Sequence, residues 1–133
     1  MKYTILVIQI LFGGIFVFMG LNHFFHFVSP PPASLKAKVF LEAMSLSGYF
    51  MDFVRIVEIV CGGLLIARTF VPLALIVLAP IVVNILLLHI FLNPSGIPMG
   101  LVVAGMQVFL MWFHRDYFIP LLTAKTKVNR IRD

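Results

Sequence analysis

The chain has 133 residues, of which 62% are hydrophobic and 11% are charged, and its mean hydropathy is +1.10. Charged residues make up about 25% of an ordinary soluble domain, so this composition excludes that class and indicates an integral membrane protein in a lipid bilayer. The net charge of +5 does not indicate nucleic-acid binding, because the ten lysines and arginines form no basic face with interleaved aromatic residues.

The first expected transmembrane helix covers residues 3–28, which contain no Asp, Glu, Lys or Arg. At about 1.5 Å per residue this run is longer than the roughly 30 Å hydrocarbon core. It is also longer than the apolar region of a signal peptide, about 7 to 15 residues, and no small-x-small cleavage site precedes Ser29. The prolines at residues 30–32 are expected to end the helix.

A short amphipathic helix is expected over residues 35–44, with Ser34 as its cap. Its apolar residues follow helical spacing, while Lys36, Lys38 and Glu42 stay polar. Such a helix lies on the membrane surface or covers the end of a bundle.

Three further transmembrane helices are expected, over residues 49–67, 70–92 and 97–117. Short links make consecutive helices antiparallel, so the sequence predicts an all-α, single-domain, up-down four-helix bundle, followed by a basic tail over residues 118–133. Pro80 is expected to kink the third helix and to free the carbonyl of Ile76. Four spans place both termini on one side, where most of the basic residues then lie, so the termini are predicted to be cytoplasmic.

Polar residues from three of these spans fall at similar depth in the outer half of the membrane. The first span runs outward and the second runs inward. Residues near the end of the first span therefore lie at the same depth as residues near the start of the second. The third span runs outward again and adds two more polar residues at this depth. The residues are Asn22, His23, His26, Arg55, Glu58, Asn84 and His89.

Helical spacing places part of this set on shared faces. Asp52, Arg55 and Glu58 are three residues apart and share one face, as do His23 and His26. A charged side chain at the bilayer centre costs about 2.5–3.5 kcal/mol on insertion scales. These side chains therefore need ion-pair partners, contact with water or a functional role. Purely structural roles stay open: Arg55 and Glu58 as an ion pair within one helix, and the histidines as interfacial residues.

The third and fourth spans contribute three more candidates. Asn84 and His89 are about 140° apart around a helix, so we expect them to point to different places. Asn84 could instead form a hydrogen bond between helices, and His89 could lie at the headgroup boundary. Gln107, near the middle of the fourth span, is expected at the floor of the pocket.

The chemistry of this set favours an apolar ligand with a polar head. His23-x-x-His26 alone is a weak metal signal, so we expect no metal. Cys61 is the only cysteine, and no Cys-x-x-Cys-His motif for haem is present. A quinone or a lipid fits best, with its head bound by His, Asn and Glu58 and its tail among Phe and Leu residues. Glu58 or a histidine could then exchange protons with the outer face.

Three stretches resemble the DoxX family of small bacterial four-helix membrane proteins. They are Gly13–His23 (G-G-I-F-V-F-M-G-L-N-H), Val57–Ile66 (V-E-I-V-C-G-G-L-L-I) and Phe70–Ala74 (F-V-P-L-A). With the spacing of the four helices, the resemblance covers nearly the whole chain. The family is similar to the membrane subunit of thiosulfate:quinone oxidoreductase, so it implies the bacterial inner membrane, a membrane redox system, and a bound quinone or a redox partner protein.

The leading hypothesis is an inner-membrane protein that binds a quinone-like or lipidic molecule in an outward-facing polar pocket, as subunit or accessory of a redox system. The alternative is a non-enzymatic structural or assembly subunit of a larger membrane complex. A proton-coupled carrier is a third, weaker hypothesis, because four helices without an inverted repeat do not favour alternating access unless the chain forms a homo-oligomer.

Overall fold

The computed structural model describes residues 2–29 and 33–124, and all regular structure among them is helical, as the sequence predicted. The elements are α1 (Lys2–Phe25), α2 (Leu35–Leu46), α3 (Phe50–Ala67), α4 (Val71–Phe91), η1 (Pro94–Gly96), α5 (Ile97–Phe113), α6 (Arg115–Phe118) and η2 (Ile119–Leu122). The proline run at residues 30–32 and most of the expected basic tail, residues 125–133, lie outside the described residues.

Three helices in the described part of the chain are long and apolar enough to cross a membrane: α1, α4 and the segment Pro94–Phe113, which contains η1 and α5. These helices fit the membrane protein that the composition predicted. The helix α3 is not one of the three, and it is the helix that carries Asp52, Arg55 and Glu58.

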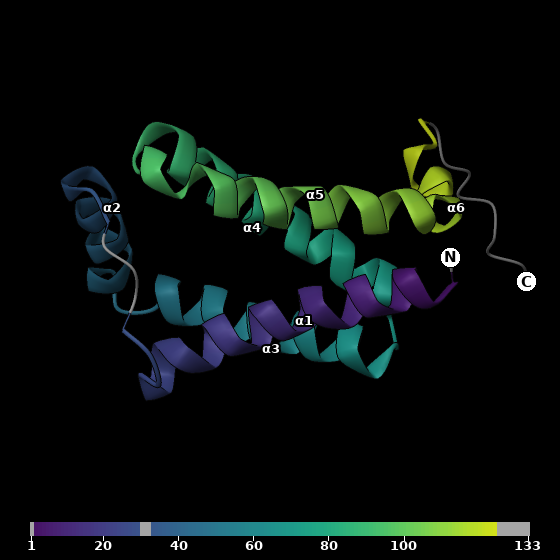
Figure 1. The fold of residues 1–133 in the computed structure, drawn as a ribbon, viewed down its shortest axis with the longest axis horizontal. Coiled ribbons are helices and arrows are strands. Elements are labelled where there is room, and N and C mark those ends of the chain that lie inside the picture. Colours follow the sequence, from purple (N-terminus) through teal and green to yellow (C-terminus); the bar gives the residue numbers. More distant parts are fainter. Residues whose placement is uncertain (1, 30–32, 125–133) are drawn as a thin grey trace, which may run out of the picture.

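The long helices pack in pairs, α1 against α3 and α4 against α5, and further contacts join α3 to α4 and α1 to α5 (Figure 1). The helix α2 lies at one end of the molecule, and the beginning of α1 lies with α6 at the other end. The core where the helices meet is apolar and contains large, fully buried side chains from all four. These include Phe12, Phe16, Leu65, Leu75, Leu78 and Leu110.

Glycines bring the backbones of α1 and α3 into direct contact. A Cβ atom at Gly13 would lie 2.7 Å from the carbonyl oxygen of Gly62, and a Cβ atom at Gly62 would lie 2.6 Å from that of Gly13. At Gly20 a Cβ atom would lie 2.9 Å from the carbonyl oxygen of Arg55. Glycine at these positions therefore permits the close approach of the two helices.

Other glycines of these helices face open space instead. At Gly14, Gly63 and Gly105 a Cβ atom would have no neighbour within 4 Å among the described residues. Consecutive residues of a helix point about 100° apart, so only one glycine of each adjacent pair can face the partner helix. The second glycine of each pair is left on the outer surface.

The helix α1 ends three residues before the predicted boundary, and Asn22 explains why. Its side-chain oxygen accepts a hydrogen bond from the backbone N–H of Val28 at 2.8 Å, so the chain turns back instead of continuing the helix. His26 adopts the left-handed conformation, with φ 57°, and its N–H donates to the carbonyl oxygen of Asn22.

Serine side chains fix both ends of α2. Ser34 caps the helix as predicted, since its hydroxyl accepts from the N–H of Ala37 at 3.2 Å. The same hydroxyl donates to the carbonyl oxygen of Leu92, and the N–H of Ser34 donates to the side chain of Asn93 at 3.3 Å. At the other end, the hydroxyl of Ser47 donates to the carbonyl oxygen of Met44 at 2.7 Å, and its backbone N–H donates to the carbonyl oxygen of Ala43. The start of α2 is therefore tied to the loop that follows α4.

The link between α3 and α4 is as tight as the sequence predicted, and it needs two residues in the left-handed region. Arg68 has φ 62° and Phe70 has φ 51°. The chain also turns at His114, so the predicted fourth span, expected to reach residue 117, is divided into α5 and the short helix α6.

Candidate functional site

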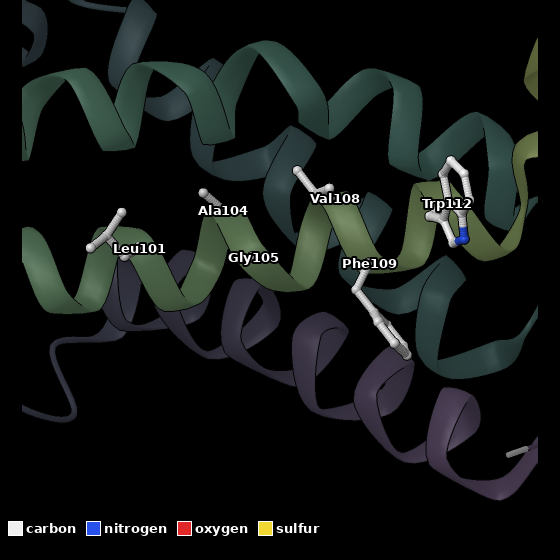
Figure 2. A pocket seen from close by; sticks show the side chains of 6 residues that line it. All are labelled: Leu101, Ala104, Gly105, Val108, Phe109 and Trp112. Atoms are coloured by element: carbon white, nitrogen blue, oxygen red, sulfur yellow. The ribbon is translucent and has the colours of Figure 1, made fainter.

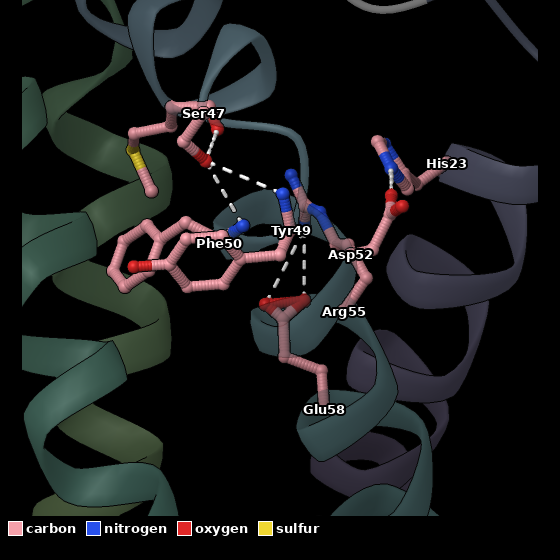
Figure 3. A network of polar contacts seen from close by, with 8 residues as sticks. His23, Ser47, Tyr49, Phe50, Asp52, Arg55 and Glu58 are labelled. Atoms are coloured by element: carbon pink, nitrogen blue, oxygen red, sulfur yellow. Dashed lines mark hydrogen bonds and ion pairs between the residues drawn. The ribbon is translucent and has the colours of Figure 1, made fainter.

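Two ion pairs lie one above the other along α3, and we call their four residues the polar row: His23, Asp52, Arg55 and Glu58 (Figure 3). Nε2 of His23, on α1, lies 3.0 Å from Oδ1 of Asp52. Nη1 of Arg55 donates to Oε1 of Glu58 at 2.8 Å and to Oε2 at 3.3 Å. The three-residue spacing on α3 places all three of its charges on one face, as the sequence predicted.

Exposure falls steadily along the polar row. The side chain of Asp52 is 59% exposed and that of His23 28%, whereas Arg55 is 21% exposed and Glu58 only 2%. The row therefore leads from the surface at the end of α3 nearest α2 to a buried carboxylate. Among the described residues no hydrogen bond joins the His23–Asp52 pair to the Arg55–Glu58 pair.

Arg55 keeps one donor without an acceptor. Its Nε atom is buried and has no hydrogen-bond partner among the described residues, although its Nη1 is bound to Glu58. A buried donor left unpaired costs about 1–3 kcal/mol, more for a charged group. An acceptor oxygen from a bound molecule beside Glu58 would remove this cost.

The start of α3 is held by Ser47, which follows α2. Its hydroxyl accepts from the N–H of Phe50 at 3.0 Å and donates to the carbonyl oxygen of Met44 at 2.7 Å (Figure 3). This contact fixes the first turn of α3 and with it the position of Asp52, two residues further on.

The remaining candidates that the sequence predicted for the outer half do not join the polar row by hydrogen bonds. Asn22 uses its side chain for the turn after α1, and His26 is exposed within that turn. Asn84 is exposed on α4, while Nδ1 of His89 donates to the carbonyl oxygen of Ile85 at 2.8 Å. The different orientations of Asn84 and His89 agree with the predicted angle between them.

Gln107 is buried on α5, where it holds two helices together. Its Nε2 donates to the carbonyl oxygen of Leu75 at 2.8 Å, while its Oε1 is buried without a partner among the described residues. The acceptor on α4 is therefore the carbonyl of Leu75, one residue before Ile76. The carbonyl of Ile76 is the one that Pro80 was predicted to leave free for a donor. An adjacent helix thus supplies a donor close to the proline, but one residue away from the predicted position.

Gln9 is a polar residue that the sequence reasoning missed. It is buried on α1, and its Nε2 donates to the carbonyl oxygen of Leu65 at 2.9 Å, on α3. A glutamine between Ile8 and Ile10 in an apolar span is the signal that could have revealed it, because such a side chain needs an internal partner.

Two pockets open elsewhere on the molecule. A shallow groove of about 560 Å³ runs along α5 and is lined by apolar residues, including Leu101, Val108 and Trp112 (Figure 2). A second pocket of about 320 Å³ lies at the end of the molecule that carries the start of α1. Neither pocket is lined by a residue of the polar row. Among residues 2–29 and 33–124, no three His, Cys, Asp or Glu side chains come together as a metal site.

Comparisons with family models, with curated proteins and with solved structures each gave no match. The described part of the chain by itself defines a class, since its regular structure is all helical and three of its helices are long and apolar enough to span a membrane. The residues and their geometry are therefore the basis for inferring a family, a ligand and an activity.

Proposed function

We propose that the chain is a DoxX-like protein of the bacterial inner membrane that binds a quinone-like or lipidic molecule at the polar row, as subunit or accessory of a membrane redox system. In this proposal α1, α3, α4 and α5 form an up-down four-helix bundle, both termini are cytoplasmic, and the polar row lies in the outer half.

The packing of α3 supports its role as the fourth span. It is 18 residues long, or about 27 Å at about 1.5 Å per residue, and glycine contacts at Gly13 and Gly20 hold it along α1. A helix whose backbone contacts a transmembrane helix at Arg55 and at Gly62 lies at the same depth as that helix there. The charges of α3 are tolerable there because Arg55 and Glu58 are paired with each other.

The observation that carries the ligand proposal is the unpartnered Nε of Arg55 beside the buried carboxylate of Glu58. A quinone presents carbonyl oxygens that accept hydrogen bonds, and Arg55 offers a free donor for one of them. Quinone reduction takes up protons together with electrons. In this proposal Glu58 is the proton-exchanging group, and the electrons come from a partner redox protein.

Co-purification tests this proposal. The protein is extracted in mild detergent and its bound small molecules are identified by mass spectrometry, for the wild type, for Glu58→Gln, and for Glu42→Gln as a matched control on the exposed face of α2. We expect a quinone or an isoprenoid lipid with the wild type and the control, and loss of most of it with Glu58→Gln. Equal amounts in all three proteins, or none in the wild type, would contradict the proposal.

A structural or assembly role is the second candidate, and the outward-facing glycines favour it. Gly14, Gly63 and Gly105 leave room on the surfaces of α1, α3 and α5 for the backbone of another helix. Crosslinking in membranes, followed by purification, distinguishes the two. A defined partner held in stable stoichiometry, together with an empty polar row, would favour assembly over ligand binding.

A further inference from the structure

The second pocket, at the end of the molecule opposite α2, has a chemistry of its own, and we call it the basic pocket. Four elements meet there: α1, the link between α3 and α4, the start of α4, and the end of α5. Its polar lining consists of Lys2, Gln9, Arg68 and His114, and no acidic residue of the described ranges 2–29 and 33–124 lines it. It is separate from the polar row and plays no part in the function proposed above.

The two cations of the basic pocket have no counter-charge in the described part of the chain. Neither Lys2 nor Arg68 lies within 4 Å of a carboxylate among residues 2–29 and 33–124. Arg68 is held in the left-handed conformation at the end of α3, which fixes its backbone at the rim. Two cations beside one small pocket repel each other, so an anion between them lowers the energy of both.

Gln9 forms the polar floor of the basic pocket. The residue is 5% exposed, and one N–H of its side-chain amide donates to the carbonyl oxygen of Leu65. A glutamine amide carries two N–H donors and one carbonyl oxygen, and the second N–H of Gln9 has no hydrogen-bond partner among the described residues. An anion in the pocket would therefore meet a buried neutral donor as well as two charges.

The remaining walls are apolar and are provided by Ile5, Leu6 and Val71. A pocket with apolar walls, a polar floor and cations at the rim matches an amphiphilic anion better than a small hydrated one. Basic pockets between transmembrane helices at the membrane surface are sites for anionic lipid headgroups.

We infer that the basic pocket binds the phosphate of an anionic glycerophospholipid, with Lys2 and Arg68 contacting the phosphate oxygens, Gln9 donating from below, and the glycerol and the first methylenes lying against the apolar walls. A soluble phosphate shares the anionic part of this chemistry but lacks the apolar part.

Native mass spectrometry of the full chain in detergent, titrated with phosphatidylglycerol or with phosphatidylcholine, tests this inference. The test variant is Lys2→Gln/Arg68→Asn, in which asparagine keeps a residue that tolerates the left-handed conformation. The matched control is Lys36→Gln/Lys38→Gln, which removes the same charge from α2 at the other end. A basic residue near anionic headgroups contributes about a factor of five in affinity, so the test variant should bind phosphatidylglycerol about 25-fold more weakly, and the control should bind it like the wild type.

Three results would overturn the inference. One is equal affinity of the wild type for the two lipids, and another is an equal loss of affinity in both variants, which would mean that only the overall charge matters. The third is complete displacement of phosphatidylglycerol by millimolar inorganic phosphate, which would assign the pocket to a soluble anion. If the test variant does not fold, as judged by circular dichroism, the single variant Lys2→Gln replaces it, with an expected loss of about fivefold and Lys36→Gln as its control.

Discussion

Nη1 of Arg55 lies 2.8 Å from Oε1 of Glu58, three residues further along α3, and the carboxylate is almost completely buried while the guanidinium keeps Nε free of any partner in the described part of the chain. This geometry leaves Arg55 able to bind a second acceptor without giving up its first. The relationship between these two residues is therefore the basis of the proposed ligand site.

Replacing Gly62 by alanine should destabilise the protein by about 1–3 kcal/mol, because the new methyl group would lie 2.6 Å from the carbonyl oxygen of Gly13, which is backbone and cannot move aside. Gly63→Ala is the control, since its methyl group would meet nothing within 4 Å in the described structure, and it should stabilise α3 by up to about 1 kcal/mol. Unfolding in mixed micelles, followed by circular dichroism, measures both. Equal effects of the two substitutions would contradict the close contact of α1 and α3.

Replacing Ser34 by alanine should release the start of α2. The substitution removes the cap on the N–H of Ala37 and the hydrogen bond to the carbonyl oxygen of Leu92, for a cost of about 1 kcal/mol. Hydrogen exchange should rise over residues 35–46 and stay unchanged in α4 and α5. Ser45→Ala, on an exposed side chain of the same helix, should leave the exchange unchanged; a similar rise in both variants would exclude a specific role for Ser34.

The two buried glutamines should respond differently to substitution by leucine. Gln9→Leu loses a hydrogen bond between α1 and α3, at a cost of about 0.6 kcal/mol. Gln107→Leu loses a similar bond to Leu75 but also removes the buried Oε1, which has no partner among the described residues, so its net effect should be close to zero. The free energies of unfolding of the two variants, measured in mixed micelles, compare these effects. A larger loss of stability for Gln107→Leu than for Gln9→Leu would show that Oε1 of Gln107 has a hydrogen-bond partner.

The sequence predicted the helices well because hydropathy and length determine them almost alone in a membrane. The boundaries were less predictable, because they depend on single side chains. Asn22 ends α1 by binding the backbone of Val28, and His114 interrupts the last span at a turn that no glycine or proline marks. The sequence does not show which glycine of an adjacent pair faces the other helix. The packing of α1 against α3 places Gly13 and Gly62 at the contact and Gly14 and Gly63 away from it.

The candidate site was predictable along one helix and less so between helices. Three-residue spacing is enough to align Asp52, Arg55 and Glu58. The pairing of His23 with Asp52 depends on the register of α1 against α3, which the glycine contacts set and which the spacing within one helix does not contain. For the same reason Gln9, whose partner is a backbone carbonyl on another helix, was missed.

The stability of the buried ion pair separates a structural from a ligand-binding role. Glu58→Leu alone should cost about 3–5 kcal/mol, because it leaves the charge of Arg55 buried without a partner. The double substitution Arg55→Met/Glu58→Leu removes both charges and should restore most of the lost stability. Unfolding in mixed micelles measures this, and a double variant as unstable as the single one would indicate that the bundle itself depends on the pair.

The binding of a short-chain quinone by this double variant and by the wild type, measured by equilibrium dialysis in the same detergent, tests the central claim most directly. We predict that the wild type binds the quinone and that Arg55→Met/Glu58→Leu, although folded, binds it at least about tenfold more weakly, equivalent to about 1.4 kcal/mol. Equal binding by the two proteins, or no binding by the wild type, would contradict the assignment of the polar row as a ligand site.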